Sequence, residues 1–100
     1  MLTAHAEADL RAILRYTRSQ WGAVQARHYA LRLETGIVAL AKKRTLGRDL
    51  RTLHDGLRVG KCEHHYIFCQ DRANRPALIL AILHERMDLM ARLADRLDGS

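Results

Sequence analysis

The side chains best suited to chemistry are those of a cysteine and three histidines, Cys62, His64, His65 and His84. Cysteine and histidine are residue types that bind zinc in proteins. The segment 65–69 is rich in β-forming residues, and neighbours on a strand point to opposite faces of a sheet. His64 and His65 therefore cannot face one ion together. We expect no metal site and no cofactor.

The two cysteines, Cys62 and Cys69, are candidates for a disulfide or for free thiols. A two-residue turn at Glu63-His64 places Cys62 opposite His65 on the paired strand. The same register places Cys69 opposite Arg58, several residue pairs further along. The two sulfur atoms are then too far apart to bond, so we expect reduced thiols.

Other catalytic groups are few. Ser19 and Ser100 are the only serines, and neither lies on a turn typical of a nucleophilic serine. His65 and His84 stand in apolar strand surroundings, where they either support the core through hydrogen bonds or contact a partner directly. The sequence predicts no catalytic residue.

Two helices are predicted in the first 41 residues. From residue 5 to 21, apolar side chains recur at the spacing of a helix buried on one side, with Thr3 as N-cap and Trp21 on the buried side. Gly22 can adopt the conformation that ends a helix, and a second apolar period then runs to Ala41. We expect an αα-hairpin that begins near residue 4.

A basic segment from Lys42 to Asp55 has no apolar period and is predicted to be a loop. Its cations could grip a phosphate backbone with strong salt dependence, and solvation is the commoner outcome for such a loop. They are Lys42, Lys43, Arg44, Arg48 and Arg51.

Strands are predicted in the second half. A β-hairpin covers residues 57–69, and the uninterrupted apolar run from Ala77 to Leu83 is typical of a central strand. Asp88 opens a short C-terminal helix. The fold class is therefore α+β, with the helical hairpin packed on one face of a small antiparallel sheet. The other face is expected to stay open, with basic residues at its rim, as the surface for a partner.

Composition limits the class of protein. With 100 residues, 48% of them hydrophobic, the chain forms one domain over residues 1–100. The net charge of +6 favours an acidic partner, either nucleic acid or protein. The longest apolar run is far shorter than the ~20 residues of a membrane span, and no secretory signal follows Met1. We expect a cytoplasmic protein.

A series of short motifs is distributed over these predicted helices and strands. In chain order they are Leu2-Thr3, Ala6-Glu7, Asp9-Leu10, Tyr16, Trp21-Gly22, Gln25-Ala26, Tyr29, Leu40-Ala41, Gly47-Arg48, Gly56-Leu57-Arg58, His65, Ile67-Phe68, Ile82-Leu83-His84 and Arg86-Met87-Asp88. Together they resemble the RelE/ParE superfamily of toxin–antitoxin toxins, and ParE more than RelE. The resemblance implies a first strand, of which Met1-Leu2-Thr3 would be the remnant. Cys69 stands where such chains often have tyrosine.

The resemblance implies the toxin of a type II toxin–antitoxin module, in a hetero-oligomer with a small acidic ParD-like antitoxin. It also implies a toxin that is not an enzyme and that inhibits DNA gyrase by protein contact, with DNA met only indirectly through the antitoxin complex. The C-terminal segment, residues 86–97, would matter for the target. Candidate contact residues for target or antitoxin are Arg58, His65, His84, Arg86, Met87, Asp88 and Met90.

Two alternatives stay open. RelE relatives cut ribosome-bound messenger RNA with cations on the sheet, and this chain offers Arg58 and Lys61. Such chemistry needs a base, an acid and cations for the phosphorane charge. The second alternative is an inactive module that only binds antitoxin.

Overall fold

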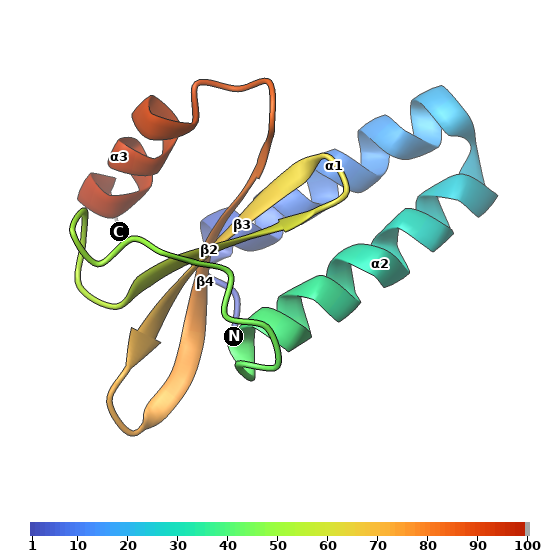
Figure 1. Ribbon diagram of the computed structural model, residues 1–100. Helices are drawn as coiled ribbons and strands as arrows, with labels where there is room; N and C mark the ends of the chain where they lie inside the picture. The colour runs from blue at the N-terminus through green and yellow to red at the C-terminus, as the bar shows by residue number, and fades with distance from the viewer. Residues whose placement is uncertain (100) are drawn as a thin grey trace.

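Residues 4–41 form the predicted helical hairpin. In the computed structural model, which describes residues 1–99, α1 (Ala4–Trp21) and α2 (Ala23–Ala41) pack against each other (Figure 1). The Thr3 hydroxyl caps α1 by accepting a 3.1 Å hydrogen bond from the Ala6 N–H. Gly22 joins the helices at φ 91°, a conformation that residues with side chains rarely adopt.

Four strands form one antiparallel sheet in the order β1-β2-β3-β4. Three of them, β2 (Leu57–Cys62), β3 (His65–Arg72) and β4 (Arg75–His84), are the predicted strands. The fourth, β1 (Arg48–Asp49), lies in the segment predicted to be a loop, so that prediction is wrong for these two residues. Two residues are too few to show the alternation by which a strand is recognised.

The register of the central hairpin is the one predicted from the Glu63-His64 turn. Cys62 pairs with His65, and Cys69 pairs with Arg58. Both cysteines are free thiols, which confirms the prediction. Burial raises the pKa of the Cys69 thiol, so this side chain is a small apolar part of the core.

The N-terminal residues lie along the free edge of β4. Leu2 forms a parallel bridge with Ile79, whose N–H donates to the Met1 carbonyl at 2.8 Å. The Thr3 N–H donates to the Ile79 carbonyl at 3.0 Å. The expected remnant of a first strand is therefore a single bridge that protects the edge of β4.

The sheet is covered on both faces. The helical hairpin packs on one face over a core of Ala6, Ile37, Leu40, Ile67, Cys69, Ile79 and Ile82. The C-terminal helix α3 (Leu89–Gly99) lies on the other side of the sheet from the hairpin (Figure 1). Its Leu93 packs in a second core with Leu57, Val59, Phe68, Leu80, Ala81 and Leu83.

The expectation of an open second face is therefore wrong. The predicted C-terminal helix exists, and its Leu89, Leu93 and Leu97 side chains pack against the sheet. An ion pair between Arg96 and Asp9 of α1 fixes it there, and Arg96 also donates to the Leu80 carbonyl at 3.1 Å. The part of the sheet beneath α3 is therefore not open to a partner.

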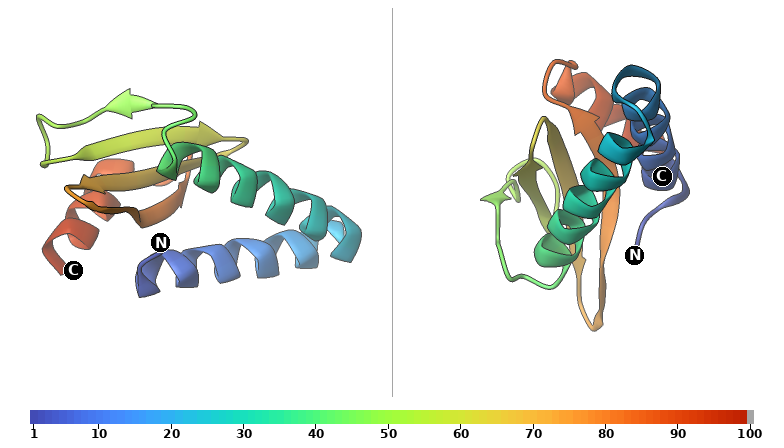
Figure 2. Two further views of the ribbon diagram at one scale, coloured as in Figure 1. Left: turned by 90° about the horizontal axis from the view of Figure 1, so that it is seen from below. Right: turned by 90° about the vertical axis from the view of Figure 1, so that its right-hand side faces the viewer.

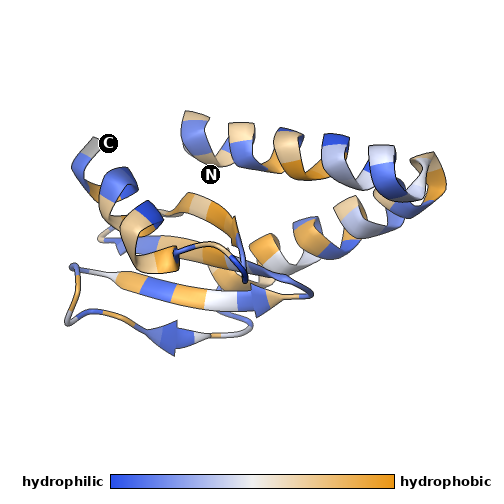
Figure 3. Cartoon of the chain, turned by 90° about the horizontal axis from the view of Figure 1, so that it is seen from above, coloured by the Kyte–Doolittle hydropathy of each residue, from blue (hydrophilic) through white to orange (hydrophobic). Residues whose placement is uncertain are grey.

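The helical hairpin extends beyond the edge of the sheet (Figure 2). Hydrophilic and hydrophobic residues alternate along both helices, including the part with no sheet beneath it (Figure 3). Trp21, predicted on the buried side, is 72% exposed because it lies at this free end. No helix of residues 1–99 is both long and apolar enough to span a membrane.

Candidate functional site

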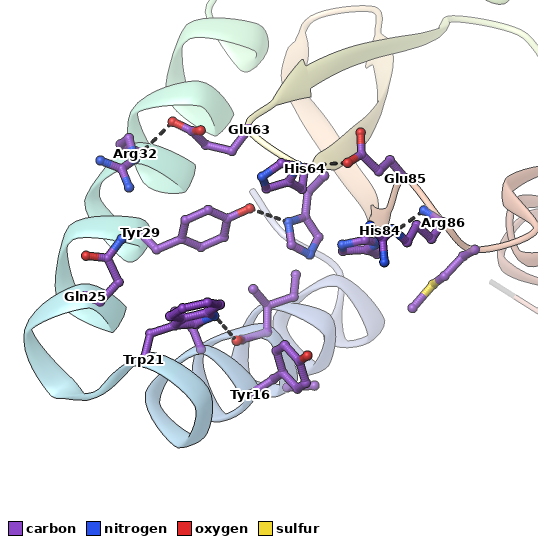
Figure 4. Close-up of a pocket in the computed structure, with 15 residues that line it drawn as sticks. Tyr16, Trp21, Gln25, Tyr29, Arg32, Glu63, His64, His84, Glu85 and Arg86 are labelled. Carbon is purple, nitrogen blue, oxygen red and sulfur yellow. Dashed lines mark hydrogen bonds and ion pairs between the residues drawn. The ribbon is translucent and has the colours of Figure 1, made fainter.

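A groove of about 910 Å³ opens where the free end of the helical hairpin faces the tip of the β2–β3 hairpin (Figure 4). α1 and α2 form one wall, through Tyr16, Trp21 and Tyr29. The β2–β3 turn and the segment after β4 form the other wall. Chain segments far apart in sequence therefore build one concave surface of the size typical of binding sites.

Aromatic rings form the floor of the groove. The Tyr29 hydroxyl and the His65 Nδ1 share a 2.6 Å hydrogen bond, and both residues are buried. The His65 ring lies edge-on to His84, with ring centres 5.1 Å apart. Burial and the neighbouring His84 and His64 lower the pKa of His65 to about 4, so His65 is neutral near pH 7.

The rim on the strand side is built from ion pairs. Glu85 accepts from Lys61 Nζ at 3.0 Å and from His64 Nδ1 at 2.8 Å, and these two bonds lower the pKa of Glu85 to about 2. Arg32 of α2 pairs with Glu63 in the β2–β3 turn at 3.0 Å. This second, exposed pair links the helical wall to the strand wall.

Two exposed features flank the groove. On the helix side, Tyr16 and Trp21 expose large aromatic surfaces, 66% and 72% of each residue. On the opposite side, Arg86 is exposed and has no ion pair within residues 1–99, and Met87 is 44% exposed. Aromatic and methionine side chains beside an unpaired cation suit a partner that is apolar with acidic groups.

His84 holds the segment that carries Arg86 and Met87. Its Nδ1 accepts from the Arg86 N–H at 3.0 Å, and its carbonyl accepts from the Met87 N–H at 3.0 Å. The segment is further tied to the β2–β3 turn, because the Glu85 N–H donates to the His64 carbonyl at 2.8 Å. Arg86 and Met87 are therefore presented on a defined turn.

Most of the predicted contact residues gather here. His65, His84, Arg86 and Met87 line the groove. Two more of them, Asp88 and Met90, lie at the start of α3. Asp88 caps the helix by accepting a 3.2 Å hydrogen bond from the Ala91 N–H, and Met90 is 57% exposed.

Arg58 is placed differently from the other predicted contacts. It is only 7% exposed, and its guanidinium pairs through two nitrogens with Asp71, each at 2.8 Å. It also donates to the Leu40 and Leu46 carbonyls at 3.0 Å. The Arg58 guanidinium lowers the pKa of Asp71. Its position is that of a buried side chain that joins the sheet to the end of α2.

The sequence did not assign the aromatic wall. Tyr16 and Trp21-Gly22 stood out only as family-like motifs, and Trp21 fitted the buried period of α1. The signal that could have found them is position: Trp21 directly precedes the hairpin glycine and so lies at the end of the helix. Among residues 1–99, no group of three or more His, Cys, Asp and Glu is arranged to hold a metal ion.

The architecture defines a class. A helical hairpin on an antiparallel sheet of this order is the fold expected of the small α+β toxins of the RelE/ParE superfamily. The model of the family described as the ParE toxin of the type II toxin–antitoxin system, parDE, matches residues 1–89. The chain therefore belongs to the family of ParE toxins, the toxin components of type II toxin–antitoxin systems, which act with a cognate antitoxin.

Three individual relatives are similar to this chain over most of its length. Toxin ParE of Escherichia coli is 60% identical over 99 residues, which cover 99% of this chain and 96% of the relative. Toxin ParE1 of Caulobacter vibrioides is 32% identical over 92 residues, covering 92% and 94% of the two chains. Toxin ParE1 of Mycobacterium tuberculosis is 28% identical over 89 residues, covering 89% and 91%.

Proposed function

We propose that this toxin inhibits DNA gyrase, and so replication and growth, by protein–protein contact, and that a ParD-like antitoxin neutralises it. The observation that carries the proposal is the groove, where exposed Trp21 and Tyr16 face Arg86 and Met87 on a fixed turn. Large aromatic, methionine and arginine side chains are the types that dominate protein interfaces. A target within the replication machinery implies a cytoplasmic location.

The ion pairs of Arg58 and Lys61 favour inhibition by protein contact over RNA cleavage. These are the two cations on the sheet that a nuclease would use. Arg58 is buried in its ion pair with Asp71. Lys61 pairs with Glu85 at 3.0 Å, and that hydrogen bond raises the pKa of Lys61. Cations engaged in this way are poorly placed to stabilise the charge of a phosphorane.

Neutralisation follows from occupying the same surface. An acidic, partly disordered antitoxin segment that folds into the groove covers Trp21 with apolar side chains and places its carboxylates near Arg86. The bound segment then blocks access to Arg86 and Met87 from outside. Inhibition of the toxin requires no change in its fold.

The test is a supercoiling assay with purified gyrase, relaxed plasmid and the full chain. We expect micromolar toxin to block supercoiling or to leave cleaved plasmid. In a parallel translation reaction with the same toxin, we expect the translated messages to stay intact. The double variant R86A/M87A should need a concentration at least about tenfold higher, because interface hot spots contribute upwards of 1 kcal/mol each. R75A is the matched control, since Arg75 is an exposed arginine at the β3–β4 turn, outside the groove.

Three outcomes contradict the proposal. The first is no effect on gyrase at micromolar toxin. The second is codon-related cleavage of translated messages that the K61A variant abolishes, which would indicate a RelE-like nuclease. The third is the absence of any growth defect on expression together with intact antitoxin binding, which would indicate an inactive binding module.

A further inference from the structure

The loop after α2 presents cations that the proposed function does not use. Within residues 42–49, every residue is exposed. The single acid of this segment, Asp49, is already paired with Arg51 at 2.8 Å. None of the remaining cations forms an ion pair in the described chain. We call this set the basic loop: Lys42, Lys43, Arg44 and Arg48.

The backbone of the basic loop is fixed by the end of α2. The Lys43 N–H donates to the Leu40 carbonyl at 3.2 Å, and the Arg44 N–H donates to the Ala39 carbonyl at 2.8 Å. These are the two bonds of a Schellman motif, in which the residue at Lys43 takes a left-handed conformation, and its φ is 58°. Glycine is the usual residue there, so a lysine is unusual on structural grounds alone.

A second attachment comes from the sheet. The buried Arg58 guanidinium donates to Leu40 and Leu46, the carbonyls on either side of the three adjacent cations. Gly47, at φ 65°, lies so close to β2 that an added Cβ would stand 2.2 Å from the Val59 carbonyl oxygen. Both ends of the segment are therefore anchored, and its cations are presented with little freedom of the backbone.

The chemistry of the basic loop suits a polyanion. Residues 42–49 contain no aromatic side chain, and Leu46, 61% exposed, is their single large apolar residue. A protein partner needs apolar anchors for affinity, whereas phosphate backbones are bound by cations that release counterions. The groove that offers apolar anchors lies toward the other end of α2, a helix about 28 Å long.

Because residues 42–49 offer no aromatic side chain on which unpaired bases could stack, we propose that the basic loop is a sequence-independent binding surface for the phosphate backbone of double-stranded DNA. This differs from the expectation that the toxin meets DNA only through its antitoxin. The inference does not depend on gyrase as the target, because the binding is a property of the toxin alone. For a target that works on DNA, the loop would raise the local concentration of toxin beside it.

The test uses the full chain, without antitoxin, and a fluorescently labelled duplex of mixed sequence in an anisotropy titration. We expect binding that weakens steeply with salt. The logarithm of the binding constant should fall linearly with the logarithm of the salt concentration, with a slope of about 0.9 for each phosphate neutralised. The variant K42Q/K43Q/R44Q should lose at least about tenfold in affinity and about 2.7 of the slope. The control R11Q/R15Q/R18Q removes the same charge from the exposed side of α1 and should change the affinity and the salt slope much less.

A single substitution separates binding from folding. Lys43→Gly places the preferred residue at the left-handed position, so the melting temperature should not fall, while the salt slope should fall by about 0.9. If the lysine served only the structure, DNA binding would be unchanged.

Three results would overturn the proposal. One is no duplex binding by the wild-type chain at low salt. Another is equal loss in the loop variant and the α1 variant, which would mean that net charge alone attracts DNA. The last is a polyglutamate peptide that binds through the loop while the duplex does not, which would make an acidic protein the partner.

Discussion

Buried polar residues in this domain work through defined partners, and Arg58 is the clearest case. The sequence offered it as a contact for target or antitoxin, yet its guanidinium satisfies Asp71 and the carbonyls of Leu40 and Leu46. Within residues 1–99, no buried side-chain nitrogen or oxygen lacks a hydrogen-bond partner. Removing one member of such a set therefore leaves the others unpaired in the protein interior.

Arg58→Ala should lower the free energy of unfolding by about 2–4 kcal/mol, because the partly exposed Asp71 carboxylate and two backbone carbonyls lose their donor. Arg51→Ala, which breaks the exposed pair with Asp49, should lower the free energy of unfolding far less than Arg58→Ala does. Urea denaturation of both variants measures the difference. A stable Arg58→Ala protein that fails to bind antitoxin or gyrase would instead make Arg58 a contact residue.

The His65 side chain predicts a pH dependence of stability. Its pKa is about 4 in the folded protein and near 6.5 when unfolded, so the unfolded chain binds more protons between these values. The stability that His65 contributes is present above pH 6.5 and is lost as the pH falls toward 4. Between pH 7 and 5 the loss should be about 2 kcal/mol.

Urea denaturation at pH 7, 6 and 5 checks this prediction. His65→Asn should flatten the decline over this range, which lies above the ordinary pKa of carboxylates. His28→Asn, at an exposed site on α2, should keep the wild-type decline. An unchanged slope in His65→Asn would show that other groups govern the acid sensitivity.

At the scale of elements, α3 is both a cover for the sheet and a carrier of candidate contacts. Leu93 faces the sheet and is 1% exposed, whereas Met90, three residues earlier in the chain, is 57% exposed. Asp88 caps the helix, and Arg96 ties it to α1 through Asp9. The C-terminal segment therefore contributes to folding as well as to the proposed contact surface.

Two substitutions on α3 separate these roles. Leu93→Ala should lower the free energy of unfolding by about 2–4 kcal/mol, because it leaves a cavity against Phe68 and Leu83. Met90→Ala should change stability by less than about 0.5 kcal/mol and weaken inhibition of gyrase. Urea denaturation and the supercoiling assay measure the two effects. Equal loss of stability in both variants would contradict the orientation of α3.

The whole molecule separates an apolar binding surface from a basic one. The groove lies at the free end of the helical hairpin. The basic loop follows the other end of α2, as the ribbon in Figure 1 shows. The net charge of +6 is spread over exposed arginines and lysines and attracts acidic partners over a distance. Charge should therefore govern the association rate of the antitoxin, and the groove should govern its dissociation rate.

Stopped-flow binding of the antitoxin can measure both contributions. Raising salt from about 0.05 to 0.5 M should slow association roughly tenfold and leave dissociation nearly unchanged. Trp21→Ala should speed dissociation about thirtyfold, the equivalent of about 2 kcal/mol, while Leu31→Ala, an exposed site on α2 outside the groove, should not. Dissociation unaffected by Trp21→Ala would place the antitoxin elsewhere.

Local signals in the chain predicted most of the elements. The cap at Thr3, the break at Gly22, the Glu63-His64 turn and the start of α3 after Asp88 were all expected and are present. Each depends on interactions between residues close in sequence, which a single sequence displays. Four of the predicted contact residues also line the groove, because the family-like motifs lie on these elements.

The amino-acid sequence by itself determined the elements, the register of the central hairpin and the resemblance to ParE toxins. Only the tertiary structure decided which surfaces are covered: α3 closes the second face, Trp21 stands beyond the sheet, and Arg58 is buried. The physical reason is that the spacing of apolar and charged residues along the sequence is the same whether or not another helix or strand packs against them. Burial depends on that distant element, and the position of the groove follows from it.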